Sequence, residues 1–402
     1  MRGSDRAAGG SDVVRPMDGM RVVDLSHVIA GPTCGHYLAR HGAEVIKVEP
    51  PGRGDVLRAG GGRTQVDEGV SVGFAAINAG KRSVAVDLKT PEGVAVVLAL
   101  AREADVFVEN WTPGVAERLG LGWDAVRAAR PDIVYASISG YGQEGEWSSR
   151  GAYDHVVQAM TGMMSLQGEA DDPPIKVGFP VIDAAAGMMA AQAVLAALLR
   201  RARGGGGAYL DVSMAQAAVH LMLSPAVLAA HEGRDRPRPG NRGFSGSPGA
   251  ATFRCADGWI ATAANTPAQF ATLCRLLGVE DVLADPALLD VDALARGAGF
   301  VVPRDAAALH ARLAAAFAAA SAAALERALA DARVPAARVR GLAEFMGEWA
   351  DGTIATAPVV RVDYPGGAVL DVGTGAKWAR TAPPPPGRAP RLGEDDRLVG
   401  GG

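Results

Sequence analysis

The first half of the chain alternates apolar, β-branched runs with stretches of helical periodicity. The apolar runs are RVVDLS, EVIKVE, SVAVDL, ADVFVEN and DIVYASIS, and helical patterns lie near residues 34–41 and over residues 91–102. This rhythm is typical of βαβ units, in which parallel strands form one doubly wound sheet with helices on its faces. The sequence therefore predicts an α/β fold built on a parallel sheet.

The second half of the chain has a different pattern. Helical stretches over residues 153–166 and 184–203 precede GGGG, the strand-like AYLDVSMAQ and helical sequence to about residue 233. The next segment, RDRPRPGNRGFSGSPG, has neither helical nor strand periodicity, and this favours a domain boundary there. TFRCADGWIATAA and Ala-rich helices over residues 304–333 predict a smaller α+β domain. We expect a flexible tail at 1–19, a large domain at 20–213 and 335–402, a linker helix at 214–239 and the small domain at 240–334.

Charge and cysteine usage exclude several classes of protein. The 402 residues carry a net charge of -4 with acids and bases interspersed, and aromatic residues make up 5%, which argues against nucleic-acid or membrane partners. Cys34, Cys255 and Cys274 are far apart and outside any metal-binding spacing, so we expect no disulfide framework and no metal site. The apolar run 184–199 is shorter than the roughly 20 residues of a membrane span. These features predict a cytoplasmic protein that acts on small molecules.

One carboxylate stands alone in the apolar stretch VGFPVIDAAAG. Because burying an unpaired charge is costly, Asp183 is either a helix cap, whose side chain binds backbone amides, or a residue with a functional role in the chemistry of the protein. The two interpretations are compatible. A helix that starts at residue 184 would place Asp183 at its N-terminus, where amides and the helix dipole favour a carboxylate.

Three other features are weaker signals. GYGQEG, at residues 140–145, satisfies GxGxxG after a predicted strand, but charged residues and glycine follow it where a dinucleotide-binding helix would pack on the sheet. His27 lies at a strand-to-helix junction and is a ligand contact or a capping residue. Arg118 lies in a short helix after a strand, where it grips a phosphate or pairs with a surface acid. An NAD-dependent oxidoreductase and a binding module without catalysis stay open as alternatives.

Eight segments taken together resemble the class III CoA-transferases, the family of formyl-CoA transferase and carnitine CoA-transferase. They are LSHVIAGP, GAEVIKVEPPGRGD, NAGKRSVAVDLKTPEG, VENWTPGVAERLGLG, IVYASISGYGQEG, GAYDHVVQAMTG, VGFPVIDAAAG and RAPRLGED, in the family's order between residue 20 and about residue 398. The resemblance implies a Rossmann-like large domain and a smaller domain, in two subunits that interlock as a homodimer. It also implies an acyl-CoA and a carboxylic acid as substrates, without a tightly bound cofactor.

The resemblance further implies roles for single residues. Asp183 matches the family's catalytic aspartate, which forms an acyl anhydride and then a CoA thioester, and Asp154 matches an acid that supports it. Contacts to CoA carry over to His27, Val28, Ala30, Val86, Asp87, Leu88, Lys89, Asn110, Trp111, Arg118 and Tyr153. A mobile glycine loop that covers the site in relatives matches Gly243, Phe244, Ser245, Gly246 and Ser247.

The chain also departs from the family pattern. Phe244 and two serines interrupt the glycine loop, and we expect Phe244 to fill space that a small acid would otherwise occupy. Pro50 and Gly151 stand where formyl-CoA transferases carry basic residues, so a formyl/oxalyl substrate pair is not expected. The α-methylacyl-CoA racemases share the fold and abstract an α-proton, and they carry a histidine where this chain has Tyr153. That difference favours a transferase over a racemase.

Overall fold

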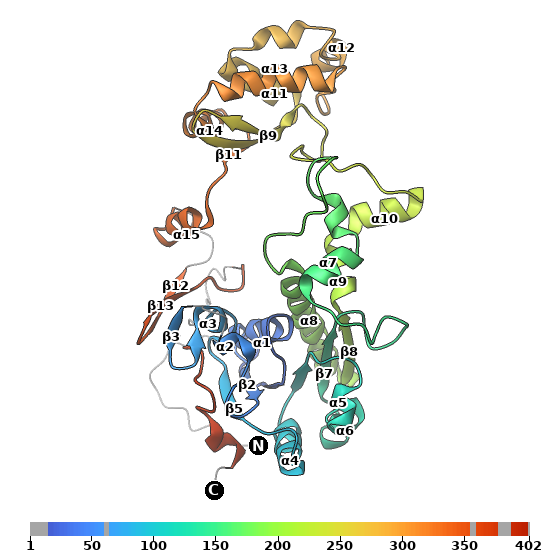
Figure 1. The fold of residues 1–402 in the computed structure, drawn as a ribbon, viewed down its shortest axis with the longest axis vertical. Coiled ribbons are helices and arrows are strands. Elements are labelled where there is room, and N and C mark those ends of the chain that lie inside the picture. The colour runs from blue at the N-terminus through green and yellow to red at the C-terminus, as the bar shows by residue number, and fades with distance from the viewer. Residues whose placement is uncertain (1–14, 60–63, 354–358, 377–386, 401–402) are drawn as a thin grey trace. The chain divides into compact units, whose positions relative to one another are not determined.

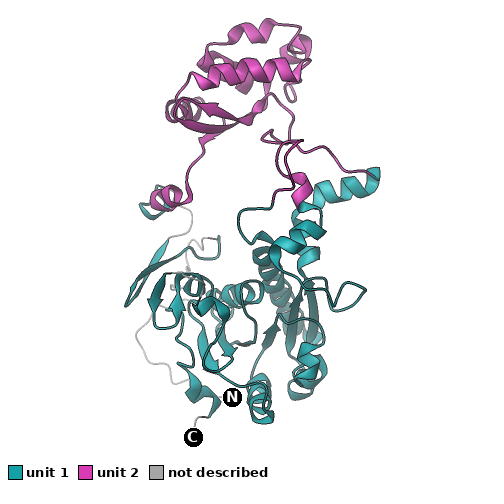
Figure 2. Ribbon diagram, viewed as in Figure 1, with its two compact units in different colours: residues 1–163, 176–233, 349–402 teal, residues 164–175, 234–348 magenta. Residues whose placement is uncertain are grey.

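The computed structural model describes residues 15–59, 64–353, 359–376 and 387–400 (Figure 1). The chain forms two compact units, which Figure 2 colours separately. Unit 1 consists of residues 1–163, 176–233 and 349–402, and unit 2 consists of residues 164–175 and 234–348. The small domain predicted at 240–334 lies inside unit 2. Residues 335–348, which we expected in the large domain, also belong to unit 2, because strand β11 (Ala336–Arg338) pairs with a strand of that unit.

Unit 1 is built on a six-stranded sheet in the order β5-β2-β1-β6-β7-β8. The strands are β1 (Arg21–Asp24), β2 (Glu44–Glu49), β5 (Arg82–Ala85), β6 (Val106–Glu109), β7 (Val134–Ser139) and β8 (Ala208–Ser213), and all neighbours are parallel. The predicted α/β fold with a parallel sheet is confirmed. The strand order runs outward in both directions from β1 and β6, so a ligand crevice is expected at the carboxyl ends of these two strands.

Helices cover both faces of this sheet. Val22 and Val23 point to opposite faces of β1, and neither side chain is exposed. α4 (Pro91–Arg102) and α6 (Trp123–Ala129) bury apolar side chains in one core with Val23 and Phe107. α1 (Ala30–Arg40) and α8 (Val181–Arg200) contact the strands and each other. The start of α4 is set locally, since the Thr90 hydroxyl accepts the Gly93 N–H at 3.0 Å.

Helix α8 starts and ends three residues earlier than the sequence pattern indicated. It begins at Val181, and with the turn that follows it to Gly205 it is long and apolar enough to cross a membrane by length and composition. Two bent pairs of described helices, α9–α10 and α13–α14, are long and apolar enough to cross a membrane only if each pair is counted as a single span. Half of the apolar window of α8 is buried inside the protein, where Ile182, Ala186 and Ala190 have no exposed surface.

The helix predicted over 153–166 is shorter in the structure. α7 spans Asp154–Met160, and a separate 3₁₀ turn follows at Met163–Leu166. Gly162 separates them with a φ of +77°, a left-handed conformation that ends a helix and favours glycine. The predicted linker helix is two helices, α9 (Met214–Leu221) and α10 (Leu223–Glu232), and both belong to unit 1.

The remaining elements of unit 1 pack beside the sheet. They are α2 (Val56–Ala59), β3 (Gln65–Asp67), β4 (Val70–Ser71), α3 (Val72–Asn78), α5 (Val115–Arg118), β12 (Val360–Tyr364), β13 (Gly367–Asp371) and the 3₁₀ turn Asp396–Val399. Phe74, Tyr364 and Val369 share a small core. The carboxylates of Asp395 and Asp396 accept the N–H groups of Ser83 and Ala85, so the C-terminal segment covers the free edge of β5.

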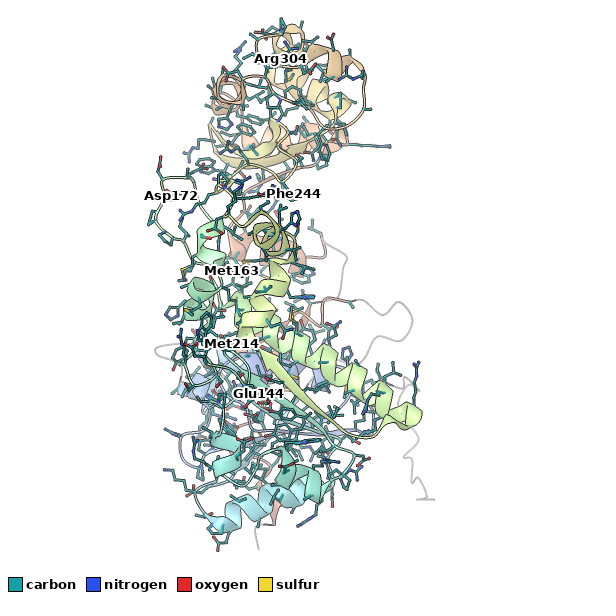
Figure 3. All side chains as sticks on the ribbon, turned by 90° about the vertical axis from the view of Figure 1, so that its right-hand side faces the viewer. Glu144, Met163, Asp172, Met214, Phe244 and Arg304 are labelled. Carbon is teal, nitrogen blue, oxygen red and sulfur yellow. The ribbon has the colours of Figure 1, made fainter. Side chains whose placement is uncertain are left out.

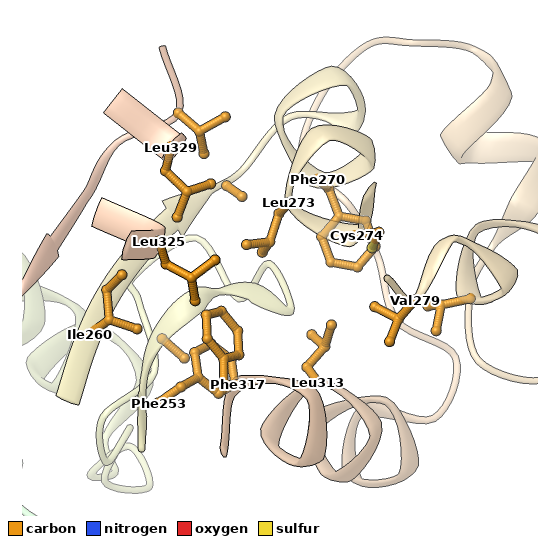
Figure 4. Packing of buried hydrophobic residues seen from close by; sticks show 14 of the residues in the cluster. Phe253, Ile260, Phe270, Leu273, Cys274, Val279, Leu313, Phe317, Leu325 and Leu329 are labelled. Atoms are coloured by element: carbon orange, nitrogen blue, oxygen red, sulfur yellow. The ribbon is translucent and has the colours of Figure 1, made fainter. Parts of the chain in front are cut away.

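Unit 2 combines an antiparallel sheet with helices. β9 (Gly249–Cys255), β10 (Gly258–Ala264) and β11 form the sheet. Its helices are α11 (Pro267–Leu277), α12 (Val291–Ala295), α13 (Ala306–Ala318) and α14 (Ala322–Asp331), while α15 (Leu342–Ala350) begins in unit 2 and ends in unit 1. Figure 4 shows the core, in which the rings of Phe253 and Phe317 stack with their centroids 4.1 Å apart. The Ala-rich helices are therefore ordered, because each buries a Leu or Phe stripe against the sheet.

Candidate active site

The carboxyl ends of β1 and β6 are joined by a reciprocal pair of hydrogen bonds. The backbone N–H of His27 donates to Asn110 Oδ1 at 2.9 Å, and Asn110 Nδ2 donates to the His27 carbonyl oxygen at 2.8 Å. One amide side chain thus satisfies both backbone groups of His27. The two residues lie where a doubly wound sheet binds its ligand, and both were predicted to contact CoA.

Asp154 and Asp183 come together at the start of α8. Oδ2 of Asp154, the first residue of α7, accepts the backbone N–H groups of Ile182 at 2.7 Å and of Asp183 at 3.1 Å. The other oxygen of Asp154 accepts a hydrogen bond from Gln158 Nε2 at 2.5 Å. The prediction that Asp183 caps this helix is wrong, because Asp183 is its third residue and the cap carboxylate comes from Asp154.

The environment of Asp183 disfavours its charged form. The side chain is partly buried at the wall of a cavity, and this burial raises the pKa of Asp183 to about 7, with the nearby negative charge of Asp154 as a second cause. At neutral pH the carboxyl group is therefore divided between its protonated and ionised forms. Such a carboxylate is a stronger nucleophile or base than one with an ordinary pKa.

Two cavities in unit 1 meet at His27 and Trp111. The Asp183 cavity, of about 110 Å³, is lined by His27, Val28, Ile29, Ala30, Asn110, Trp111, Thr112, Pro113, Ile138, Ser139, Gly140, Arg150, Ala152, Tyr153, Asp183 and Met214. The Lys89 cavity, of about 440 Å³, is lined by Leu25, Ser26, His27, Lys47, Val48, Glu49, Pro50, Arg53, Gly54, Asp55, Val56, Val86, Asp87, Leu88, Lys89, Trp111 and Leu119. His27 and Trp111 are the two residues that line both cavities.

The structure brings most of the predicted CoA contacts to these two cavities. His27, Val28, Ala30, Asn110, Trp111 and Tyr153 line the Asp183 cavity, whereas Val86, Asp87, Leu88 and Lys89 line the other. Arg118, the last residue of α5, is exposed and is not among the lining residues of either cavity. Asp154 is buried and is not among the lining residues of either cavity; its carboxylate contacts the backbone of α8.

The predicted glycine loop belongs to unit 2. Ser245 Oγ donates to Asn265 Oδ1, and the buried Ser247 Oγ donates to the Ala264 carbonyl oxygen at 3.0 Å, so its serines tie the loop to β10 and the turn after it. Within unit 2 the Phe244 side chain is fully exposed (Figure 3). The serines therefore anchor this loop, which a run of glycine residues would not do.

Several residues of the site were not singled out from the sequence. Arg150, Ile138 and Met214, the last shown in Figure 3, line the Asp183 cavity. Glu109, at the end of β6, is buried and lines neither cavity, but it accepts the N–H of the lining residue Trp111 at 2.8 Å, and burial raises the pKa of Glu109 to about 7. A carboxylate at the end of the apolar run VFVE was the available signal for Glu109. Nothing local marked Ile138 or Met214, because their place in the wall depends on packing.

The GYGQEG segment does not have the geometry of a dinucleotide fingerprint. Residues 140–153 form turns in which Gly142 and Gly145 have φ values of +92° and +93°, and the next helix begins only at Asp154. The Gln143 N–H donates to Asp211 Oδ2 at 2.9 Å. This residue of β8 therefore already accepts a backbone N–H that a bound phosphate would need. This geometry disfavours the NAD-dependent alternative.

The chain is similar to proteins of one known family. The family model described as CoA-transferase family III matches residues 17–396. Succinyl-CoA:glutarate CoA-transferase of Mus musculus is 38% identical over 274 residues, which cover 68% of this chain and 62% of the mouse protein. Succinyl-CoA:mesaconate CoA-transferase of Haloarcula hispanica is 34% identical over 387 residues, or 94% of each chain. The chain thus spans about three fifths of the mouse relative and nearly all of the archaeal one.

Solved structures show the same architecture. A CAIB/BAIF family protein from Brucella suis superposes with a TM-score of 0.83 at 29% identity, and the match covers 96% of this chain and 98% of that one. Rv3272 from Mycobacterium tuberculosis superposes with a TM-score of 0.79 at 31% identity, over 96% of this chain and 99% of its own. Because these matches cover nearly the whole chain, they include both units.

Proposed function

Since the chain belongs to CoA-transferase family III, we propose that it transfers CoA from an acyl-CoA donor to a carboxylic acid, with the Asp183 carboxylate as the nucleophile. The observation that carries this proposal is the position of Asp183. Its partly buried carboxyl group lines a small cavity that meets the larger Lys89 cavity at His27 and Trp111. CoA bound through the Lys89 cavity would present its thioester beside Asp183.

In the first half of the proposed reaction, Asp183 replaces the donor acid in the thioester with CoA. The Asp183 carboxylate oxygen attacks the thioester carbonyl carbon, the C–S bond breaks, and CoA leaves as a thiolate from a mixed acyl-aspartyl anhydride. The thiolate then attacks the aspartyl carbonyl carbon of that anhydride. The donor acid leaves as a carboxylate, and Asp183 carries CoA as a thioester.

The second half repeats these steps in reverse with the acceptor. The acceptor carboxylate attacks the aspartyl thioester, which releases CoA thiolate and forms a second anhydride. The thiolate attacks the acyl carbonyl of the acceptor, so that a new acyl-CoA forms and the Asp183 carboxylate is restored. Exclusion of water from the cavity during these steps would limit the hydrolysis of both anhydrides, and Ile29, Ile138 and Met214 are the larger apolar side chains near Asp183 that line it.

Asp154 has two consequences for this chemistry. Its hydrogen bonds to the N–H groups of Ile182 and Asp183 hold the first turn of α8, so the nucleophile stays fixed while acyl groups are exchanged on it. Its negative charge also helps to keep the pKa of Asp183 high, after the larger effect of burial. A raised pKa makes the carboxylate a better nucleophile toward a thioester.

We propose dicarboxylic acids as the substrates. The names of three relatives refer to succinate, glutarate, mesaconate and oxalate, which all carry a second carboxylate. Arg150 is the one arginine or lysine among the described residues that line the Asp183 cavity. Its guanidinium lies 4.7 Å from the centroid of the Trp147 ring and pairs with the exposed Glu146 carboxylate at 3.8 Å. A guanidinium in this position suits the remote carboxylate of a dicarboxylic acid.

We also propose a homodimer in the cytoplasm as the working form, and an interlocked pair is our preferred arrangement. Large apolar side chains are exposed along α8, α9 and α10, among them Met188, Leu199, Val219, Leu221 and Val227. A surface of this kind needs a partner to cover it. Light scattering coupled to size-exclusion chromatography would give the mass, and a monomer at micromolar concentration would contradict the dimer.

The racemase alternative is less well supported by the cavity. A racemase needs a base on each face of the α-carbon. Tyr153 lines the Asp183 cavity, whereas His155 is exposed and is not among the residues that line it. Succinyl-CoA:mesaconate CoA-transferase of Haloarcula hispanica, which matches over 94% of both chains, is named for CoA transfer. Exchange of the α-hydrogen for deuterium without any acceptor acid would revive the racemase.

Chemical trapping tests the proposal directly. The protein is incubated with succinyl-CoA, quenched with hydroxylamine or borohydride, and digested for mass spectrometry. We expect modification of Asp183 alone, with the Asp183→Asn variant as the unmodified control. Turnover of CoA between two acids without any modification of Asp183 would refute the mechanism.

A further inference from the structure

The backbone of Val28 is in an unusual conformation. Its φ is +65°, in the left-handed region that glycine favours and that β-branched residues rarely adopt. Val28 lines the Asp183 cavity and follows His27, which lines both cavities. Strained residues of this kind persist only where their surroundings hold them in place, and they are often found at functional sites.

A buried ion pair holds the backbone on both sides of His27. Lys47 Nζ lies 3.0 Å from Asp55 Oδ2, and neither side chain has any exposed surface. The same ammonium donates to the Ser26 carbonyl oxygen at 2.6 Å. The Val28 N–H donates to both carboxylate oxygens of Asp55, at 3.2 Å and 3.3 Å. The pair thus contacts the residue before His27 and the residue after it.

Asp55 is itself held in one position. Its backbone N–H donates to Glu49 Oε2 at 2.9 Å, and its carboxylate also accepts the Leu57 N–H at 3.0 Å. Glu49 in turn pairs with the buried guanidinium of Arg58 at 2.7 Å. The acceptor of the Val28 N–H therefore cannot move without breaking a buried network.

We propose that Lys47 and Asp55 are positioning residues, which force Val28 into its left-handed conformation and so align residues 26–30 with Asp183. The proposal rests on the proposed function for its effect on catalysis. Burying two charges is a poor way to gain stability, because the loss of solvation offsets most of the attraction. The pair instead fixes the geometry of the loop where the two cavities meet, and this role explains why two charges are buried there.

A double-mutant cycle tests the link between Asp55 and Val28. In Val28→Gly the left-handed conformation has no steric penalty, and this variant serves as the second background of the cycle, with its own KM for succinyl-CoA as the reference. Asp55→Asn should raise the KM for succinyl-CoA by roughly tenfold in the original protein and by less than about threefold in the Val28→Gly background. An equal loss in both backgrounds would overturn the proposal.

A second variant covers the case in which Asp55→Asn does not fold. Lys47→Met/Asp55→Leu replaces the pair by apolar side chains, which a buried site tolerates better than one unpaired charge. We expect it to fold by circular dichroism and to raise the Kd for CoA, measured by calorimetry, by roughly tenfold. The control is Arg40→Met/Asp371→Leu, which removes another buried pair that lines neither cavity. An unchanged Kd in the first variant would overturn the proposal.

The readouts separate this proposal from the proposed function. If the original protein binds CoA but transfers it to no acid, the transferase proposal fails while the Kd comparison still tests the positioning pair. If the original protein transfers CoA, and Lys47→Met/Asp55→Leu binds CoA with the same Kd as the control Arg40→Met/Asp371→Leu, only the positioning proposal fails.

Discussion

The carboxylate of Asp154 accepts the backbone N–H of Asp183 at 3.1 Å, so one acid of the site holds the main chain of the other. The same contact brings a negative charge near the Asp183 carboxyl group, which adds to the effect of burial on its pKa. Position and acidity of the proposed nucleophile are therefore coupled through a single side chain.

The pH dependence of activity follows from the pKa of Asp183. The attacking species is the carboxylate, and the pKa of this group is raised to about 7. We expect kcat/KM for the acyl-CoA donor to rise with pH through about 7 and then to level off, in stopped-flow measurements over the range from about 5 to 9. A rate that is constant across this range would contradict ionisation of Asp183 as the controlling step.

Stability should depend on pH in the opposite sense. Because burial raises the pKa of Asp183 above its unfolded value, the folded state binds the proton more tightly, and stability falls as pH rises from the ordinary value toward about 7. Asp183→Asn cannot ionise at this position. The Tm of this variant minus the Tm of the original protein should therefore be larger at about pH 8 than at about pH 5, on the two sides of the raised pKa. Equal differences in Tm at both pH values would contradict this assignment.

Two substitutions of Asp154 separate its contact from its charge. Asp154→Ala removes the acceptor of two backbone N–H groups, and we expect a loss of about 1–2 kcal/mol in the free energy of unfolding. Asp154→Asn keeps one acceptor oxygen and removes the charge, so the pH–rate curve should shift toward lower pH with a smaller loss of stability. A curve that does not move in Asp154→Asn would assign the raised pKa of Asp183 to burial alone.

Asn110 is expected to matter through the backbone of His27. Asn110→Ala removes both bonds of the reciprocal pair, each worth about 1 kcal/mol, so the KM for acyl-CoA should rise by roughly ten- to thirtyfold. Asn110→Asp serves as the control, since it keeps the acceptor for the His27 N–H and loses the donor to the carbonyl. If both variants bind CoA like the original protein, the pair has no role in binding.

Arg150 tests the substrate class. A hydrogen bond to a charged group contributes about 1.5–3 kcal/mol, so Arg150→Gln should raise the KM for succinate or glutarate by roughly ten- to hundredfold. The KM for butyrate, which lacks the second carboxylate, should not change. Arg127→Gln is the matched control, because Arg127 also stacks on a tryptophan but lines neither cavity. Equal effects on both classes of acid would contradict recognition of the remote carboxylate.

Some parts of the fold and site could be predicted from the sequence because their signals are local. The apolar, β-branched runs in RVVDLS and EVIKVE predict strands, and Thr90 followed by Pro91 marks the start of α4. His27 and Asn110 each follow a predicted strand directly. Parallel strands end at the same edge of a sheet, so these residues had to lie near one another once the sheet formed.

Other parts could not be predicted because they depend on contacts between distant segments. The cap of α8 comes from Asp154, far from Asp183 in the sequence, and no local pattern reports that contact. The end of α7 at Met160 was missed, because its apolar period continues past a glycine whose backbone breaks the helix.

The sequence by itself determined the parallel sheet, the family, and the identity of the acid at position 183, since periodicity and motif order are properties of the chain alone. Only the tertiary structure decided what that acid can do. Burial and the nearby Asp154 raise the pKa of Asp183, and the Lys47–Asp55 pair holds Val28 at the wall of the same cavity. Desolvation, charge proximity and backbone strain are set by packing in three dimensions, and no stretch of sequence contains them.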